Sequence, residues 1–330
     1  MRAFDHSAVQ SADEAVAALR GQDEASLIAG GADLLSLMKA DVVAPAHIID
    51  LKPARDLRGV SVAADGAVRL GALTTLAEIE RDEALAERLP ILRAAVRDAA
   101  TPQLRNMATL GGNLMQRNRC WYLRGPYACW QKGGDRCFAR EGQNKYHAIF
   151  YDGSCVAVHP SDLAPALLAL DARVEVVGPA GPRALAIDEL LQTPTAERRR
   201  EATLAADEVI VAVTVPAQPA NAHGVYLKLM ERQAWAYALV SAAAQLALTE
   251  DGRVEQARVV LGGVASAPRR LPAVEALLVG QAVTPELATR AAEVAITGAT
   301  PLAHNGYKVQ MARELTRRAI LQVAGAQRDG

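Results

Sequence analysis

Four cysteines are the only ones in this 330-residue chain, and all of them fall in one segment near its middle. Cys120, Cys129, Cys137 and Cys155 are separated by 8, 7 and 17 residues. The stretch 117–155 around them has little hydrophobic periodicity, and a loop of this length is usually functional or tied down by something. Thiolates suit both zinc and iron–sulfur clusters, although this spacing has no CxxC pair and matches neither a zinc ribbon nor the ferredoxin pattern. We therefore predict a metal site, with unpaired core cysteines or disulfides as alternatives.

Composition narrows the class of protein further. Hydrophobic residues make up 51% of the chain, which is enough for a packed core and argues against disorder. A net charge of −1 and an aromatic content of 4% give no argument for nucleic-acid binding. No apolar run approaches the roughly 20 residues that a membrane span needs. The first residues lack the apolar segment of a signal peptide, so we expect a cytoplasmic location, although export together with a signal-bearing partner would leave no trace here.

The pattern of apolar residues predicts an α+β fold with two domains. Residues 1–216 form the first domain in this interpretation, and the cysteine insert lies within it at about 117–155. Pro216 to Asn221 is typical of a linker. Residues 222–330 form a smaller domain with a three-stranded sheet and helices. The expected helices are 11–20, 34–39, 74–79, 84–100, 159–170, 272–279, 285–298 and 306–324; the expected strands are 26–29, 47–51, 68–72, 173–177, 208–215, 224–229 and 254–262, with 236–249 either helix or strand.

Two glycine pairs are candidate ligand loops. The first is Ala29-Gly30-Gly31-Ala32-Asp33-Leu34-Leu35, a glycine turn that leads into a helix. The second is Thr109-Leu110-Gly111-Gly112-Asn113. Glycines let backbone N–H groups approach a phosphate, and a helix start favours negative charge. Each pair alone is more often an ordinary turn, and neither matches a nucleotide-binding motif, but together they could grip the two ends of a long dinucleotide.

Other polar residues have simpler interpretations when taken one at a time. Asp162 follows Ser161 at a helix start, where capping is the simplest role. Lys228 is interpreted as surface charge, and His147 and His159 as hydrogen-bonded loop residues. Basic side chains in the insert could offset the negative charge of a thiolate-bound cluster, or form a solvated surface. They are Arg117, Arg119, Arg124, Lys132, Arg136, Arg140 and Lys145.

The ordered set of motifs resembles the FAD-binding medium subunits of the xanthine dehydrogenase and carbon monoxide dehydrogenase family. The resemblance covers essentially the whole chain. It rests on 29–35, Thr101-Pro102-Gln103-Leu104-Arg105-Asn106, 108–113, Pro160-Ser161-Asp162-Leu163-Ala164-Pro165, 228–232, 238–243 and Leu261-Gly262-Gly263-Val264. It implies a two-lobed FAD domain followed by a small α+β domain.

The cysteine insert is similar to that of the branch containing periplasmic aldehyde oxidoreductase and 4-hydroxybenzoyl-CoA reductase. That resemblance implies a [4Fe–4S] cluster with Cys120, Cys129, Cys137 and Cys155 as its ligands. It also implies FAD contacts. The pyrophosphate is expected on the backbone of Ala29, Gly30, Gly31, Ala32, Asp33, Leu34 and Leu35, and the rest of the FAD at Thr101, Thr109, Gly112, Asn113, Asp162, Ile210 and Lys228.

Two departures from the family pattern affect the expected site. Ala32 stands where threonine is common, so backbone contacts must replace a side-chain contact to phosphate. Ala236 stands where an acidic residue is frequent after Arg232, between Trp235 and Tyr237, so the surroundings of the flavin differ from those of NAD-using relatives.

The resemblance implies an electron-transfer subunit without catalytic residues of its own, since the cofactors carry the chemistry. The expected partners are a large subunit with the molybdenum cofactor, a small subunit with two [2Fe–2S] clusters, and an external electron acceptor. One alternative is a reductase of the 4-hydroxybenzoyl-CoA type, in which electrons flow inward. Two others are a zinc-binding scaffold subunit and a free-standing flavin oxidase.

Overall fold

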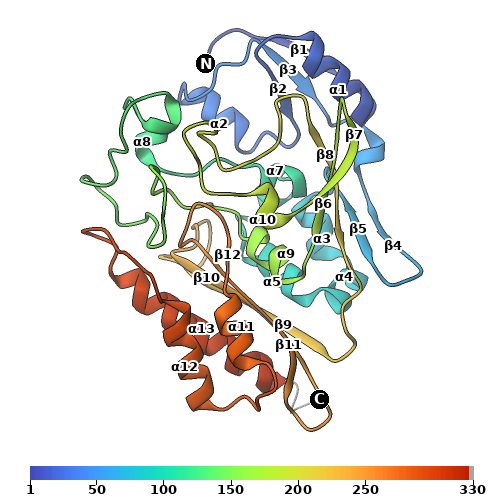
Figure 1. Cartoon of the computed structure of the whole chain (residues 1–330). Helices are drawn as coiled ribbons and strands as arrows, with labels where there is room; N and C mark the ends of the chain where they lie inside the picture. Colours follow the sequence, from blue (N-terminus) through green and yellow to red (C-terminus); the bar gives the residue numbers. More distant parts are fainter. Residues whose placement is uncertain (327–330) are drawn as a thin grey trace.

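The computed structural model describes residues 1–326 and contains three β-sheets with helices packed on them (Figure 1). This is the predicted α+β class. Within residues 1–326, no helix combines the length and the apolar character that crossing a membrane requires.

The first lobe is built on a parallel three-stranded sheet in the order β1-β3-β2. Ser11 accepts the backbone N–H of Glu14 and so caps the first helix, as the sequence predicted. The glycine loop lies between the second strand and the second helix. The elements are β1 Asp5–Ala8, α1 Ala12–Gly21, β2 Ala25–Ile28, α2 Leu34–Lys39, β3 His47–Asp50 and the 3₁₀ turn η1 Arg55–Leu57.

The second lobe is an antiparallel five-stranded sheet in the order β4-β5-β8-β6-β7, accompanied by short helices. Every residue of α9 is buried, and α9 packs against α5 on one side and against the C-terminal sheet on the other. The elements are β4 Val60–Val62, β5 Val68–Gly71, α3 Leu76–Arg81, α4 Glu83–Arg88, α5 Pro90–Asp98, α6 Pro102–Arg105, α7 Leu110–Leu114, α9 Leu163–Ala169, β6 Arg173–Gly178, β7 Gly181–Ala186, α10 Ile187–Leu190 and β8 Val209–Val215.

The third sheet is antiparallel in the order β12-β11-β10-β9 and is covered by three helices (Figure 1). The long α13 packs against β9 and β10. The elements are β9 Ala222–Leu229, β10 Val240–Leu248, β11 Val254–Gly262, β12 Arg269–Arg270, α11 Pro272–Leu278, α12 Pro285–Ala295 and α13 Tyr307–Ala326.

Three expectations about regular structure need correction. The C-terminal sheet has four strands rather than the predicted three, because the two-residue β12 pairs with β11 and is too short to show an apolar pattern. The single helix predicted over 84–100 is two helices, α4 and α5, because the chain turns at Leu89 and restarts with Pro90 at the first helical position. Residues 236–249, left open between helix and strand, contain strand β10, and its alanine-rich stretch is buried between two neighbouring strands.

The cysteine insert is mostly irregular, with one short helix α8, Trp121–Arg124, and one 3₁₀ turn η2, Trp130–Lys132. The C-terminal part of the chain fixes its second half. The buried Asn305 donates from Nδ2 to the carbonyls of His147 (3.1 Å) and Ala148 (2.9 Å). Lys308, also buried, donates to the carbonyls of His147 (2.9 Å) and Gly263 (2.5 Å). The start of α13 therefore holds the insert through side chains 157 to 161 positions away.

We predict that Asn305→Leu destabilises the protein by about 3 kcal/mol, since each buried polar group left unpaired costs about 1–3 kcal/mol. The substitution keeps the size of the side chain but leaves two carbonyls and the Leu302 N–H without their partner. Thermal unfolding of the full chain measures this. Asn106→Leu is the matched control, because Asn106 is exposed and its side chain bonds only Arg81, at 3.3 Å, in the described part of the chain. Equal unfolding temperatures in the two variants would contradict the prediction.

Candidate functional site

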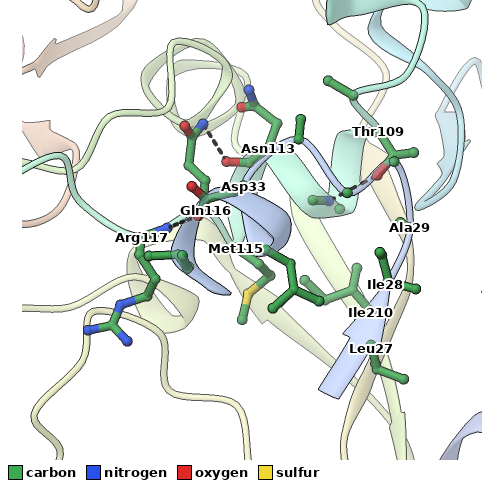
Figure 2. A pocket seen from close by; sticks show the side chains of 18 of the residues that line it. Leu27, Ile28, Ala29, Asp33, Thr109, Asn113, Met115, Gln116, Arg117 and Ile210 are labelled. Atoms are coloured by element: carbon green, nitrogen blue, oxygen red, sulfur yellow. Dashed lines mark hydrogen bonds between the residues drawn. The ribbon is translucent and has the colours of Figure 1, made fainter. Parts of the chain in front are cut away.

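A cavity of about 510 Å³ lies where the loop after β2 meets the segment around α7 (Figure 2). The segment 204–210, which leads into β8, forms another wall, and residues 235–237 also line it. This volume is within the range of cofactor sites, which are commonly concave and largely apolar with a few polar groups. The two glycine loops singled out in the sequence thus border one cavity.

Gly30 lets the two loops touch. A Cβ atom at this position would lie 1.7 Å from the carbonyl oxygen of Met107, well inside van der Waals contact. Gly31 has a φ of +71°, in the left-handed region that side chains disfavour. Glycine is therefore required at Gly30 by close approach of backbone and favoured at Gly31 by conformation.

The first loop also offers unpaired donors. Among the described residues, the backbone N–H groups of 30–34 have no hydrogen-bond partner, and they lie immediately before and at the start of α2. Arg119 lines the same cavity, and its Nε is buried without a partner in residues 1–326. Free N–H groups in a glycine turn beside a guanidinium suit an anionic group such as a pyrophosphate.

In the second loop and in the segment before it, the predicted polar side chains bind other groups of the chain. Thr109 Oγ1 accepts the N–H of Gly112 at 3.2 Å, and Thr101 Oγ1 accepts the N–H of Leu104 at 3.3 Å. Both hydroxyls cap short helices, so in this structure they act on the backbone. Asn113 accepts a hydrogen bond from Ser161 Oγ at 2.6 Å through its Oδ1. Its position at the cavity wall still allows a ligand contact (Figure 2).

Asp162 does not cap α9. The N–H of Ala164 is accepted by Ser161 Oγ, and Asp162 binds two residues of β9 instead. Lys228 Nζ lies 2.8 Å from one carboxylate oxygen, and the Tyr226 hydroxyl donates to the other at 2.8 Å. Burial raises the pKa of Asp162, and the charge of Lys228 opposes that shift. The side chain of Lys228 is fully buried, so Lys228 is not the surface charge that its isolated position suggested.

The structure brings most of the predicted cofactor residues to the cavity wall. Those that line it are Ala29, Gly30, Gly31, Ala32, Asp33, Leu34, Thr109, Gly112, Asn113, Asp162 and Ile210. Leu35, Thr101 and Lys228 do not line it. Lys228 reaches the wall indirectly, because it holds Asp162, whereas Thr101 serves as a helix cap.

Several lining residues were missed because no local pattern marks them. Leu27 and Ile28 belong to β2, and their period-two alternation is that of any core strand. Trp235 and Tyr237 line the cavity from the loop before β10, and both are substantially exposed. Trp235 has a φ of +51°, which is uncommon for a bulky residue and marks a strained position. In the sequence both stood out only as the neighbours of Ala236 in the expected flavin surroundings.

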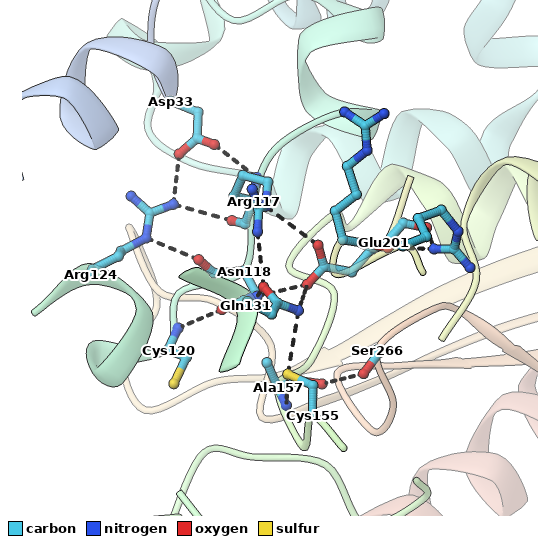
Figure 3. A network of polar contacts seen from close by, with 12 residues as sticks. Asp33, Arg117, Asn118, Cys120, Arg124, Gln131, Cys155, Ala157, Glu201 and Ser266 are labelled. Atoms are coloured by element: carbon cyan, nitrogen blue, oxygen red, sulfur yellow. Dashed lines mark hydrogen bonds and ion pairs between the residues drawn. The ribbon is translucent and has the colours of Figure 1, made fainter. Parts of the chain in front are cut away.

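Asp33 joins the cavity to the cysteine insert (Figure 3). Its carboxylate accepts the backbone N–H of Arg117 (2.8 Å), Arg119 Nη1 (2.5 Å) and Arg124 Nη2 (2.9 Å). Arg124 belongs to α8, whose N-cap residue is Cys120. Asp33 makes no capping hydrogen bond to α2. Its carboxylate instead links the first glycine loop to α8, the helix that begins after Cys120.

The four cysteines are free thiols that lie near one another. Cys120 packs with Cys155 beside Trp130, and with Cys137 beside Tyr122. Burial raises the pKa of the Cys120 thiol to about 11, and the neighbouring Cys129 and Cys137 add to this rise. Burial also raises the pKa values of Cys129 and Cys155, and charge on Cys137 again contributes to both. The disulfide alternative does not apply, because no pair is bonded in this structure.

Within residues 1–326, no group of three or more His, Cys, Asp or Glu side chains is close enough to hold one metal ion. A single zinc ion binds each sulfur at about 2.3 Å. A four-iron cluster places a separate iron before each thiolate and therefore holds the sulfurs farther apart. Four neighbouring free thiols match the ligand set of such a cluster.

Two histidines near the cysteines have different surroundings. His147 Nε2 lies 3.2 Å from Cys120 Sγ, and burial lowers the pKa of His147 to about 4. His159 is buried beside Ser161, and burial lowers its pKa to about 4 as well. Both imidazoles are therefore neutral at pH 7, and each is a hydrogen-bonded loop residue, as the sequence predicted.

Comparisons with known proteins agree on one family. The model of the FAD binding domain in molybdopterin dehydrogenase matches residues 2–218, and that of the CO dehydrogenase flavoprotein C-terminal domain matches residues 225–323. The FAD-binding subunit of an aldehyde oxidoreductase from Escherichia coli (strain K12) is 36% identical over 99% of this chain and 100% of its own length. The nicotine 6-hydroxylase medium subunit of Paenarthrobacter nicotinovorans is 29% identical, with 98% of both chains covered.

A solved structure gives the same result at the level of fold. A chain of the carbon monoxide dehydrogenase from Hydrogenophaga pseudoflava superposes with a TM-score of 0.79 at 28% identity, covering 99% of this chain and 98% of that one.

We predict that Gly30→Ala weakens FAD binding by at least about tenfold, equivalent to about 1.4 kcal/mol. The added methyl group would overlap the Met107 carbonyl and push the two loops apart. The measurement is FAD retained per chain after gel filtration, followed by titration of the apo-protein with FAD. Gly21→Ala is the control, because a Cβ there meets nothing within 4 Å. If Gly30→Ala bound FAD as tightly as this control, the assignment of the loop would be wrong.

Proposed function

Because this chain belongs to the family of FAD-binding medium subunits of the molybdenum hydroxylases, we propose that it passes electrons between partner subunits and an external acceptor. As a subunit of an oxidoreductase it binds FAD and needs no acid–base residues of its own. Bound FAD would supply a carrier able to exchange electrons singly with iron–sulfur clusters and singly or in pairs with an external acceptor. The residues of the chain bind and orient it, and the partners supply the substrate site.

We assign the pyrophosphate of FAD to the loop 29–34. Support comes from its unpaired backbone N–H groups, the close approach at Gly30 and the nearby Arg119 guanidinium. Asn113, Asp162 and Ile210 line the rest of the cavity and would contact the remainder of the cofactor. Lys228 would act by fixing Asp162, since the buried pair leaves the ammonium no other partner in residues 1–326 than the carbonyl of Asp98.

We further propose that Cys120, Cys129, Cys137 and Cys155 hold a [4Fe–4S] cluster. Support comes from the donor set of four free thiols. Cys120, Cys137 and Cys155 lie in two hydrophobic clusters that share Cys120, and Cys129 is close enough to Cys120 to raise its pKa. Backbone and amide N–H groups already point at one of them: Ala157 N lies 3.4 Å from Cys155 Sγ, and Gln131 Nε2 lies 3.3 Å from the same sulfur. Thiolates of iron–sulfur clusters commonly accept such hydrogen bonds.

We propose a large subunit with the molybdenum cofactor and a small subunit with two [2Fe–2S] clusters as partners, and residues 1–216 and 222–330 as the two domains. The relatives favour oxidation of an aldehyde or an N-heterocycle, since their names include an aldehyde oxidoreductase and a nicotine hydroxylase. A reductase of the 4-hydroxybenzoyl-CoA type, with inward electron flow, is the second candidate. Turnover of aldehydes by the purified complex would favour the first.

The deciding experiment is an anaerobic visible spectrum of the full chain with flavin, iron and zinc quantified. We expect about one FAD and about four irons per chain, with a broad brown absorbance. Zinc without flavin would contradict the proposal and favour the structural scaffold. Substrate turnover by the isolated chain would instead favour a free-standing flavin oxidase.

We predict that Cys129→Ala loses the iron, because the cluster would lack one of its four thiolates. Ser154→Ala is the matched control, since Ser154 is an exposed residue of the same insert and its substitution leaves all four thiols in place. Iron per chain is measured in both variants. Full iron retention in Cys129→Ala would refute its assignment as a ligand.

A further inference from the structure

A glutamine side chain connects a buried carboxylate to one of the four cysteines. Gln131 lies in η2, between Cys129 and Cys137. Its Nε2 is 3.3 Å from Cys155 Sγ and 3.0 Å from Glu201 Oε1 (Figure 3). An amide nitrogen has two hydrogens, so it can donate one to each acceptor.

The surrounding groups determine which way this amide points. Arg117 Nη2 is 2.9 Å from Gln131 Oε1, and Asn118 Nδ2 is 2.9 Å from the same oxygen. A guanidinium can only donate, and the carboxylate of Glu201, when ionised, can only accept. Rotating the amide by half a turn would place its oxygen against the carboxylate and its nitrogen against the guanidinium. The orientation with an N–H directed at Cys155 is therefore the one that every neighbour satisfies.

Glu201 is well placed to hold this orientation. Its side chain is only 3% exposed, and it accepts hydrogen bonds from Asn118 Nδ2 (2.7 Å) and Gln131 Nε2 (3.0 Å). Arg117 forms an ion pair with it, with Nε 3.5 Å from Oε2, although the geometry is not that of a hydrogen bond. Burying an ionised carboxylate costs free energy unless it is paired and hydrogen-bonded. The carboxylate of Glu201 therefore keeps the surrounding donors directed at it.

We propose that Gln131 is the residue that raises the reduction potential of the cluster, through an N–H···S hydrogen bond to Cys155. This inference rests on the proposed [4Fe–4S] cluster. Reduction adds one electron and no proton, so the thiolates become more negative. A fixed N–H dipole stabilises the more negative state more strongly, because hydrogen bonds to charged acceptors are stronger than those to neutral ones. Hydrogen bonds to the sulfurs are among the factors that set cluster potentials.

The test compares the full chain with its Gln131→Met variant, which keeps the length of the side chain but has no N–H. Iron per chain is measured first. The midpoint potential of the cluster is then determined by redox titration followed by electron paramagnetic resonance. We expect unchanged iron content and a shift to a more negative potential. Gln22→Met is the matched control, because Gln22 is exposed and lies at the end of α1; its potential should equal that of the wild type.

The outcomes separate the two proposals. A wild-type chain without iron would overturn the cluster itself. A loaded Gln131→Met variant with the wild-type potential, or with a more positive one, would overturn the role of Gln131 while leaving the cluster intact. Gln131→Leu serves as a second variant should methionine disturb the insert. Loss of iron from both variants, with iron present in the wild type, would show that Gln131 holds the insert together, which also overturns the proposal.

Discussion

The carboxylate of Asp33 is the interaction on which the arrangement of this protein depends. It binds a backbone N–H and two guanidinium groups from the insert while its own backbone forms part of the first glycine loop. Removing one partner from such a cluster leaves a charge uncompensated. The resulting loss of stability is larger than the net stabilisation that the intact ion pair provides. The loop and the insert therefore keep one relative position, and the cavity and the cysteines are held at a defined separation.

A second buried pair joins the first domain to the C-terminal sheet. Lys228 on β9 reaches across to Asp162 at the start of α9, and Tyr226 on the same strand donates to the other oxygen. These residues lie two positions apart, so they face the same side of the strand. This geometry does not require ligand contact by Lys228, because the lysine shapes the cavity by holding the carboxylate that lines it.

Much of the fold could be predicted from local pattern, because capping and periodicity act over a few residues. Ser11 with Glu14 defined the start of α1, and the bounds of α2 matched the predicted helix 34–39. The break at Leu89 was missed, since alanine, leucine and arginine continue the helical pattern through it. Strand β7 was missed because it is mostly exposed and carries no apolar run.

The site was predictable only in part, for the same physical reason. Glycine pairs and clustered cysteines stand out in a sequence, because few roles need them. Glu201, Gln131 and Asn118 are ordinary polar residues whose importance lies in distances across 13 to 83 positions. Lys228 was predicted as a residue of the site, but its ion pair with Asp162 could not be predicted from the sequence. The assignments of FAD contacts and cluster ligands therefore remain predictions that the geometry supports.

The hydrogen bonds from Asn305 and Lys308 to the insert affect the order in which the chain folds during synthesis. Contacts separated by about 160 residues form late, because loop closure over such distances requires both segments to be present. During synthesis the N-terminal lobes can fold while α13 is still missing, since domains fold as units as the chain emerges. The cysteine segment then stays open on one side until the last helix docks. For the proposed [4Fe–4S] cluster, this interval before α13 docks would be the time when iron and sulfide reach the thiols most easily.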